Sequence, residues 1–312
     1  MSNPSRSVVA LDDLAVISIH GDDAVSFLNG QLTHDIAGLA PGQARLTGYC
    51  TAKGRLLATL IVWVDNTQPG QLYALIKADI AQAIIKKLSM FVLRAKVKLS
   101  LADARVYGVA EPASDQTAQD PTYHVRPDTK DVWIAAPSAG PVRYWVVACG
   151  AEAFSESTEE PSGTDAAQRW QAQDIAAGLP WIQASTQDVF IPQTLNLDLI
   201  DGVSFTKGCY PGQEVVARSH YRGTVKRRMA YGVAQADQSL APQEPQAIAG
   251  TDIFNANKPD SPCGRVINAA FASNAWHFLL EIQLADLSDA DFRLGASDGP
   301  AITLRPLPYE IN

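Results

Sequence analysis

The segment from Phe205 to Arg218 holds the side chains whose types and spacing best suit chemistry. Cys209 follows Lys207 by two residues, and a nearby ammonium favours the thiolate, which is the reactive form of cysteine. Gln213 and Glu214 add an amide and a carboxylate just beyond. We interpret Cys209 as a functional thiol whose thiolate form Lys207 favours.

Two glycines, Gly208 and Gly212, enclose the Cys-Tyr-Pro turn at Cys209. Glycine permits positive φ and close approach of the backbone to a ligand or another segment. A purely structural interpretation stands beside the functional one: the glycines shape a tight turn and Cys209 is a small buried filler. A Cys/His nucleophile pair with His220 is a further alternative, although sequence proximity does not place a base.

Composition bounds the class of protein. The 312 residues are 46% apolar, enough for a real core and for two or three domains. The net charge of −8 argues against a general nucleic-acid or membrane-surface binder, so we expect no direct DNA binding and no membrane association. Four widely spaced cysteines and the lack of a signal-peptide pattern in residues 1–14 predict a reduced, soluble, cytoplasmic chain.

Common catalytic motifs are missing from the sequence. It contains no P-loop, no G-x-G-x-x-G, no H-E-x-x-H and no G-x-S-x-G. The five histidines show no close ligand pairing, so we expect no metal site.

The elements that position these side chains follow from apolar periodicity. In the first hundred residues this periodicity predicts a helix at 24–32, which follows an Asp N-cap. It predicts a second helix that begins at Asp79 and has an apolar face made of Ile80, Ile84, Ile85 and Leu88. Strands are predicted at residues 14–19, within 49–64, at 72–76 and at 95–101. This order fits an α+β layer with antiparallel pairing.

The second half of the chain is predicted to contain loops, two helices and many short strands. Residues 111–131 and 151–165 are predicted loops, and 166–177 is a predicted helix closed by Gly178 and Pro180. Strands are predicted at 133–136 and 144–148, and Val215 and Val216 indicate a helix whose N-terminus faces the Cys209 turn. After residue 225, short β-like runs predict a small barrel or sandwich, at residues 229–233, 263–270, 277–284 and 301–304.

The string Lys207-Gly-Cys-Tyr-Pro-Gly-Gln-Glu214 closely resembles the K-G-C-Y-x-G-Q-E signature of the YgfZ family. That family contains folate-binding proteins related to the aminomethyltransferase (T-protein) of the glycine cleavage system. The resemblance covers most of the chain and extends to four further segments, Gly21 to Asp35, Tyr49 to Arg55, Phe190 to Gln193 and Arg305 to Tyr309.

The resemblance implies an α+β fold arranged as a three-lobed ring. The first α+β domain is split between residues 1–48 and 105–224. Residues 49–104 form the second α+β domain, and residues 225–312 form a C-terminal β-barrel. A reduced folate, tetrahydrofolate or a derivative that can be polyglutamylated, lies in the central channel of such a ring.

The resemblance also implies ligand contacts. Trp170 lies where the family has a folate-contacting tryptophan, and an indole suits stacking on a flat pterin. Leu14 and Ala176 depart from the family, which can carry a tryptophan and a pterin-binding glutamate there. Further folate contacts are implied at Gly208, Tyr210, Gly212, Gln213, Glu214 and Arg218.

The function implied is that of a folate-dependent accessory protein for iron–sulfur cluster assembly or repair. Its partners are iron–sulfur enzymes, including tRNA-thiolating enzymes, so its support of tRNA modification is indirect. The alternative is a tetrahydrofolate-dependent one-carbon transferase of the aminomethyltransferase type, which needs a carboxylate as acid or base. Whether the chain is an enzyme stays open at this point.

Two concentrated basic segments interrupt the acidic chain. Residues 207–228 carry six Lys/Arg and one Glu, and residues 86–98 carry five Lys/Arg and no acid. If both segments lie at one channel mouth, their positive charge suits the binding of polyglutamyl folate. In the first segment, the residues expected to attract the glutamate tail of folate or an acidic partner are Arg218, Arg222 and residues 226–228.

Overall fold

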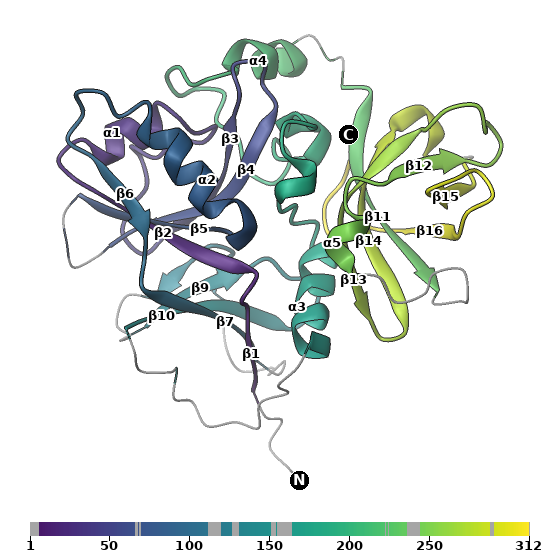
Figure 1. Cartoon of the computed structure of the whole chain (residues 1–312), viewed down its shortest axis with the longest axis horizontal. Helices are drawn as coiled ribbons and strands as arrows, with labels where there is room; N and C mark the ends of the chain where they lie inside the picture. Colours follow the sequence, from purple (N-terminus) through teal and green to yellow (C-terminus); the bar gives the residue numbers. More distant parts are fainter. Residues whose placement is uncertain are drawn as a thin grey trace.

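The computed structural model contains two five-stranded antiparallel sheets and a closed six-stranded barrel (Figure 1). The structure describes residues 6–65, 68, 70–111, 120–126, 131–150, 154, 164–221, 223, 225–235, 244–287 and 290–311.

The first sheet has the order β3-β4-β5-β2-β6. Its strands are β2 (Leu14–His20), β3 (Ala44–Cys50), β4 (Leu56–Val64), β5 (Gln71–Lys77) and β6 (Lys98–Leu101). The predictions of strands at 14–19, within 49–64 and at 72–76 are confirmed. The strand predicted at 95–101 begins only at Lys98, because Lys96 bonds instead to the turn before α1: its N–H donates to the Asp23 carboxylate at 2.8 Å.

Two helices join this sheet, α1 (Ala24–Asn29) and α2 (Ala78–Ser89). The apolar side chains predicted for one face of α2 are buried, which confirms that helix. Asp23 stands at the N-cap of α1 as predicted, but its side chain makes no capping hydrogen bond, since the carboxylate is used by Lys96. Among the described helices, none has the length and apolarity needed to cross a membrane.

The second sheet has the order β1-β7-β10-β9-β8. Its strands are β1 (Ser7–Ala10), β7 (Ala104–Glu111), β8 (Val125–Arg126), β9 (Val132–Ala136) and β10 (Val142–Cys149). It packs on the first sheet through a shared apolar cluster that includes Leu46, Ile61 and Leu75 from one sheet and Val106, Ile134 and Trp145 from the other.

Helix α3 (Thr164–Ala176) lies between the second sheet and the barrel (Figure 1). It contacts β1 on one side and β13 and β14 of the barrel on the other. Gly178 ends it with a φ of +69°, as the sequence predicts for a helix stop. Because α3 joins two parts of the fold, its inward side chains can link them.

The barrel has the order β11-β14-β13-β12-β15-β16 and closes through pairing of β11 with β16. Its elements are β11 (Arg227–Gln235), α5 (Pro245–Ile248), β12 (Asp252–Asn255), β13 (Gly264–Ala272), β14 (Ala275–Gln283), β15 (Phe292–Leu294) and β16 (Ala301–Arg305). The prediction of a β-rich barrel after residue 225 is confirmed. Short 3-10 turns occur at Ala184–Thr186, Pro192–Leu195 and Leu284–Asp286.

The strands of the first sheet can be compared with the domain boundaries that the family resemblance implies. The boundary expected at residue 48 falls inside β3, and the first sheet gathers strands from residues 14–101. The split into folding domains itself stays a prediction. Of the loop predicted at 111–131, residues 125–126 form β8, which pairs with β9. Most of the loop predicted at 151–165 lies outside the described residues.

The close contact between Gly108 and Trp170 generates a test of the packing. A Cβ at Gly108 would lie 2.4 Å from Trp170 Cε3, so we expect Gly108→Ala to lower the free energy of unfolding by about 1–3 kcal/mol. Urea unfolding followed by tryptophan fluorescence measures the loss. Adding Trp170→Leu, which removes the clashing ring, should recover part of it.

Gly140→Ala is the matched control, because a Cβ there meets nothing within 4 Å. Its effect should stay within about 0.5 kcal/mol. Equal losses in the Gly108 and Gly140 variants would contradict this packing.

Candidate functional site

The Cys209 turn packs on the tip of the β3–β4 hairpin. It leads into α4 (Gln213–Tyr221), which confirms the helix predicted after the turn. Gly212 has a φ of +82°, and a Cβ there would lie 2.5 Å from both Gly54 Cα and the Thr51 carbonyl oxygen. The two turns therefore approach backbone to backbone, which only glycine permits at this position.

Other segments of the family resemblance gather at the same place. Arg55 Nη1 donates to the Val189 carbonyl at 2.9 Å, and the Leu56 N–H donates to the Phe190 carbonyl at 2.7 Å. The buried Gln193 amide donates to the Val216 carbonyl in α4. Segments that are 49–55, 190–193 and 205–218 in the sequence thus form one structural unit.

Lys207 points inward, toward the end of α1. Its Nζ donates to the carbonyls of Asn29 and Leu32, the latter at 2.6 Å, and lies 5.0 Å from the centre of the Tyr210 ring. Burial lowers the pKa of Lys207 from 10.5 to about 8, against opposing effects of Asp35 and Cys209. The lysine fixes this turn to α1.

Cys209 itself is exposed, so the interpretation of this cysteine as a buried filler is wrong. Gly208, Glu214 and Arg218 are exposed beside it, Gly212 and Gln213 are half-buried, and Tyr210 is buried. His220 stacks on Phe205 with ring centres 3.7 Å apart. A functional role for the Cys209 thiol stays a prediction.

The basic segment 207–228 offers less free charge than its composition suggests. Arg228 is buried and pairs with Asp198 at 2.6 Å, and Arg227 pairs with Glu281 at 3.0 Å. Together with Lys207, three of its six cations have partners inside the fold, while Arg222 lies outside the described residues.

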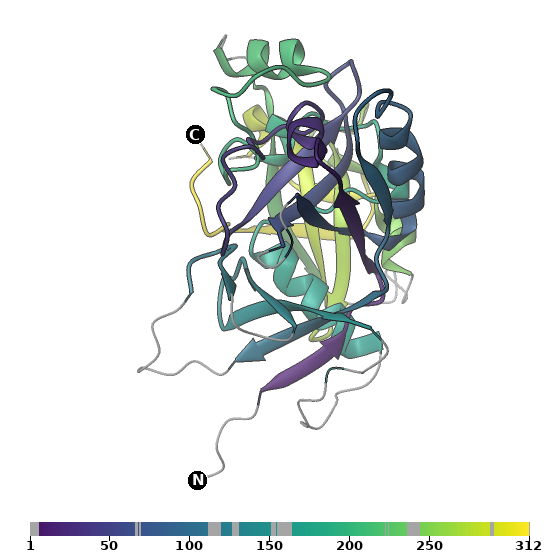
Figure 2. The same cartoon turned by 90° about the vertical axis from the view of Figure 1, so that its left-hand side faces the viewer.

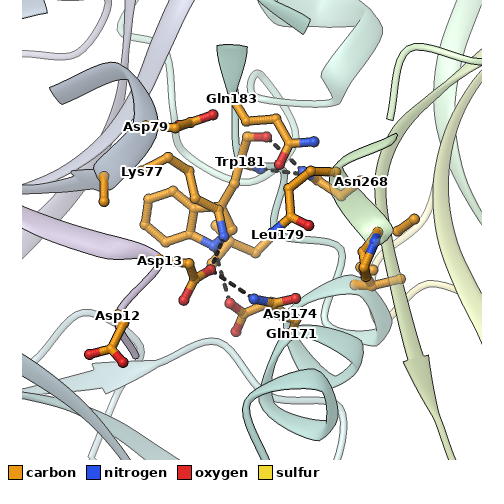
Figure 3. A pocket seen from close by; sticks show the side chains of 15 residues that line it. Asp12, Asp13, Lys77, Asp79, Gln171, Asp174, Leu179, Trp181, Gln183 and Asn268 are labelled. Carbon is orange, nitrogen blue, oxygen red and sulfur yellow. Dashed lines mark hydrogen bonds and ion pairs between the residues drawn. The ribbon is translucent and has the colours of Figure 1, made fainter. Parts of the chain in front are cut away.

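A cavity of about 240 Å³ lies where α3, the start of α2 and the barrel meet (Figure 3). Its walls carry four carboxylates, one ammonium and four side-chain amides, from Asp12, Asp13, Asp79, Asp174, Lys77, Gln171, Gln183, Gln246 and Asn268. Trp181, Ile175 and Leu179 supply apolar surface. The volume is near the lower end of ligand pockets, roughly 300–1,000 Å³, and suits a ring system with hydrogen-bonding edges.

Asp174 is the buried centre of this wall. Arg143, whose side chain is fully buried, places Nη2 3.0 Å from Asp174 Oδ1, and Trp181 Nε1 donates to Asp174 Oδ2 at 3.1 Å. Burial raises the pKa of the Asp174 carboxyl, and Arg143 and Lys77 oppose that rise. With both oxygens in contact with protein groups, Asp174 positions Trp181.

Asp13 offers a second carboxylate, closer to solvent. Lys77 Nζ pairs with Asp13 Oδ2, and Gln171 Nε2 donates to the same oxygen at 2.9 Å (Figure 3). On the opposite wall, Asn268 and the Trp181 backbone exchange two hydrogen bonds, of 2.9 and 2.7 Å. Among the described residues no hydrogen bond reaches Asp13 Oδ1, so this carboxylate oxygen can accept from a ligand.

A second cavity of about 390 Å³ lies beside Tyr309. Its lining includes Tyr123, Asp201 and Gly178, and Leu179 lines both cavities. Tyr309 OH donates to the Gly178 carbonyl at 3.2 Å. Neither basic segment contributes a lining residue to either cavity, so a common channel mouth lined by both segments stays a prediction.

Trp170 lies in the core between the sheets and is 4% exposed. Its ring packs on Gly108, and the Arg143 guanidinium lies 4.6 Å from the ring centre. Leu14 belongs to the same apolar cluster. Trp170 lines neither of the two cavities. Helix α4, which follows the Cys209 turn, lies at the top of the molecule in Figures 1 and 2, at the end opposite β1. Folate contacts at Trp170 and at the signature stay predictions.

Asp13, Asp174, Lys77 and Trp181 were not singled out by the sequence. The sequence offered one clue to this cavity: Asp174 lies two residues before Ala176, the position at which the family can carry a pterin-binding glutamate.

Comparison with known proteins gives relatives over the whole chain. The tRNA-modifying proteins YgfZ of Serratia proteamaculans and Photorhabdus laumondii are each 30% identical to it, and both alignments cover 98% of this chain and 93% of the relative. A crystal structure of glycine cleavage system aminomethyltransferase T from Bartonella henselae superposes with a TM-score of 0.74 at 15% identity, covering 97% of this chain and 86% of that one. No family model matches.

The buried ammonium of Lys207 generates a pH test. Because its folded pKa of about 8 is below the ordinary 10.5, the unfolded chain binds more protons between these values, and stability gains from this group as pH rises. We expect the free energy of unfolding of the wild type, relative to Lys207→Met, to increase from pH 7.5 to pH 9.5 in urea titrations. Lys86→Met, at an exposed lysine, controls for the general loss of a cation; a difference that stays flat for Lys207 would refute its burial.

Proposed function

The chain belongs to the YgfZ family of tRNA-modifying proteins, and from this we propose that it is a tetrahydrofolate-binding accessory protein for iron–sulfur enzymes. Its support of tRNA modification would run through such enzymes. Two features support the proposal: the cavity of Figure 3, with carboxylate and amide groups around an apolar wall, and the exposed thiol of Cys209 in the family signature.

The lining of the cavity fits a pterin ring. The pyrimidinone edge of tetrahydrofolate carries several N–H donors, and a carboxylate is a strong acceptor for them. Asp13 and the amides of Gln171 and Gln183 would hold that edge, and Trp181 with Leu179 would cover a ring face. The bound folate would supply a carrier of one-carbon units, and these side chains would bind and orient it.

Acidic lining also indicates which end of folate enters. Four carboxylates against one ammonium repel the glutamate tail, so the pterin end would lie inside and the tail outside. Only the head of folate is expected in this volume.

The second candidate is one-carbon transfer of the aminomethyltransferase type. The observation that favours it is Asp13, a partly buried carboxylate in the same cavity, because that chemistry needs an acid or base. Steady turnover of an aminomethyl donor with tetrahydrofolate, abolished by Asp13→Asn, would establish it.

Folate binding is tested by variants in the two cavities. We expect tetrahydrofolate to raise the melting temperature of the wild type, and Asp13→Asn to weaken its affinity by about tenfold or more, since a hydrogen bond to a charged group is lost. Calorimetric titration measures the affinity. Asp201→Asn, in the cavity beside Tyr309, is the control and should bind like wild type. A loss in that variant with full binding by Asp13→Asn would move the site to the second cavity, and no binding by the wild type would end the folate proposal.

The thiol is tested in a strain that lacks this protein. We expect Cys209→Ala to restore the activity of a tRNA-thiolating iron–sulfur enzyme at least about tenfold less well than wild type, because no other group at the turn replaces a thiolate. Cys149→Ala removes the other exposed cysteine and should complement fully. Full complementation by Cys209→Ala would remove the functional thiol.

A further inference from the structure

The connection from α2 to β6 leaves three large apolar side chains in solvent. Met90 is 62% exposed, Phe91 49% and Leu93 88%. The apolar face of α2 does not cover them, because it is buried on the first sheet. Single exposed apolar residues are ordinary, but a cluster of three within four residues indicates an interaction site.

Cations surround these side chains. Residues 86–98 carry five of them, whereas the rest of the chain has 20 basic and 33 acidic residues. Lys96 pairs with Asp22 at 3.0 Å, and in the part of the chain that the structure describes no ion pair involves Lys86, Lys87, Arg94 or Lys98. We call residues 86–98 the α2–β6 patch.

The backbone of the α2–β6 patch is fixed before any partner arrives. A Cβ at Gly21 would lie 1.9 Å from the Lys96 carbonyl oxygen, so the two segments are in direct backbone contact, and Asp23 accepts from the Lys96 N–H. Leu93 has a φ of +46°, a conformation that costs free energy in a non-glycine residue and that turns its side chain outward. Preformed presentation lowers the entropy cost of binding.

We propose that the α2–β6 patch is the docking surface for a partner protein whose own surface combines carboxylates with an apolar pocket. Met, aromatic residues and Arg are the types enriched at the centres of protein interfaces, and Met90, Phe91 and Arg94 supply them. The unpaired lysines form a cationic rim that steers an acidic partner.

Other occupants fit less well. A second copy of this chain would bring two cationic patches together in a symmetric contact. Nucleic acid would use aromatic rings and arginine, whereas two of the three exposed apolar side chains here are aliphatic. A membrane surface needs a long apolar helix face, and that of α2 is already buried.

Helix α1 connects the α2–β6 patch to the Cys209 turn. Lys96 contacts Asp22 and Asp23 just before α1, and Lys207 contacts Asn29 and Leu32 at its end. The six residues of α1 span about 9 Å, so a protein docked on the patch would lie beside the short helix to whose far end the Cys209 turn is attached. For the role of the thiol, though not for docking, this inference rests on the proposed function.

Photo-crosslinking in cells tests the docking surface. With p-benzoylphenylalanine in place of Leu93, we expect adducts to a protein, mapped by mass spectrometry to a segment rich in Asp and Glu. The double variant Lys86→Glu, Lys98→Glu should lower the adduct yield about tenfold or more, and the charge-conserving Lys86→Arg, Lys98→Arg should leave it unchanged. The photo-reactive residue at Ala139, on the β9–β10 turn, controls for random contact.

The outcomes separate docking from thiol function. Adducts to nucleic acid, to lipid or to a second copy of this chain, an equal yield from position 139, or no adduct at position 93 would each overturn the docking surface. Cys209→Ser should leave the adduct yield at position 93 unchanged, because the thiol lies outside the patch. If Cys209→Ala fails to complement and position 93 gives no adduct, the functional thiol stands and the docking surface falls. If Cys209→Ala complements fully and position 93 gives the expected adduct, the docking surface stands and the functional thiol falls.

Discussion

The buried carboxylate of Asp174 is the constraint on which the meeting point of the fold depends. Its partners come from separate parts of the chain: Arg143 from β10 of the second sheet and Trp181 from the segment after α3. Trp181 in turn holds Asn268 of the barrel, and Lys77 of the first sheet lies 5.8 Å from its ring centre. Removing one partner of a buried pair typically costs about 3–5 kcal/mol, since the other charge stays desolvated. The position of Trp181 in the cavity wall therefore depends on the buried pair of Arg143 and Asp174.

This arrangement separates the cavity from the exposed cysteine. The cavity lies at the junction of the sheets and the barrel, whereas the exposed thiol lies on a turn that is attached to the β3–β4 hairpin and to α1. A small ligand in the cavity and a partner protein at the thiol would therefore not compete for space. Communication between them would run through the first sheet, because Lys77 ends β5 and the Cys209 turn packs on the tip of β3–β4.

Local pattern was enough to predict most elements but not the contacts between them. Helix α2 follows from its apolar spacing, and the end of α3 follows from Gly178. The shortening of β6 was not predictable, because Asp23 and Gly21 act on Lys96 from more than seventy residues away. For the same reason residues 226–228 were expected to attract an acidic ligand or partner, although Asp198 and Glu281 of this chain already pair with Arg228 and Arg227. Asp174 carried no local mark of burial, since its partner Arg143 is on another element.

The pairing of β11 with β16 has a consequence for synthesis on the ribosome. Strands β2 to β6 are contiguous in the sequence, so the first sheet can form while the rest is still being made. The barrel cannot close until Thr303 to Arg305 emerge, and Tyr309, which bonds to Gly178, comes later still. The half-built barrel then exposes open strand edges, which are prone to pairing with other chains. The barrel of a nascent chain thus keeps an open edge until residues 303–305 pair with β11.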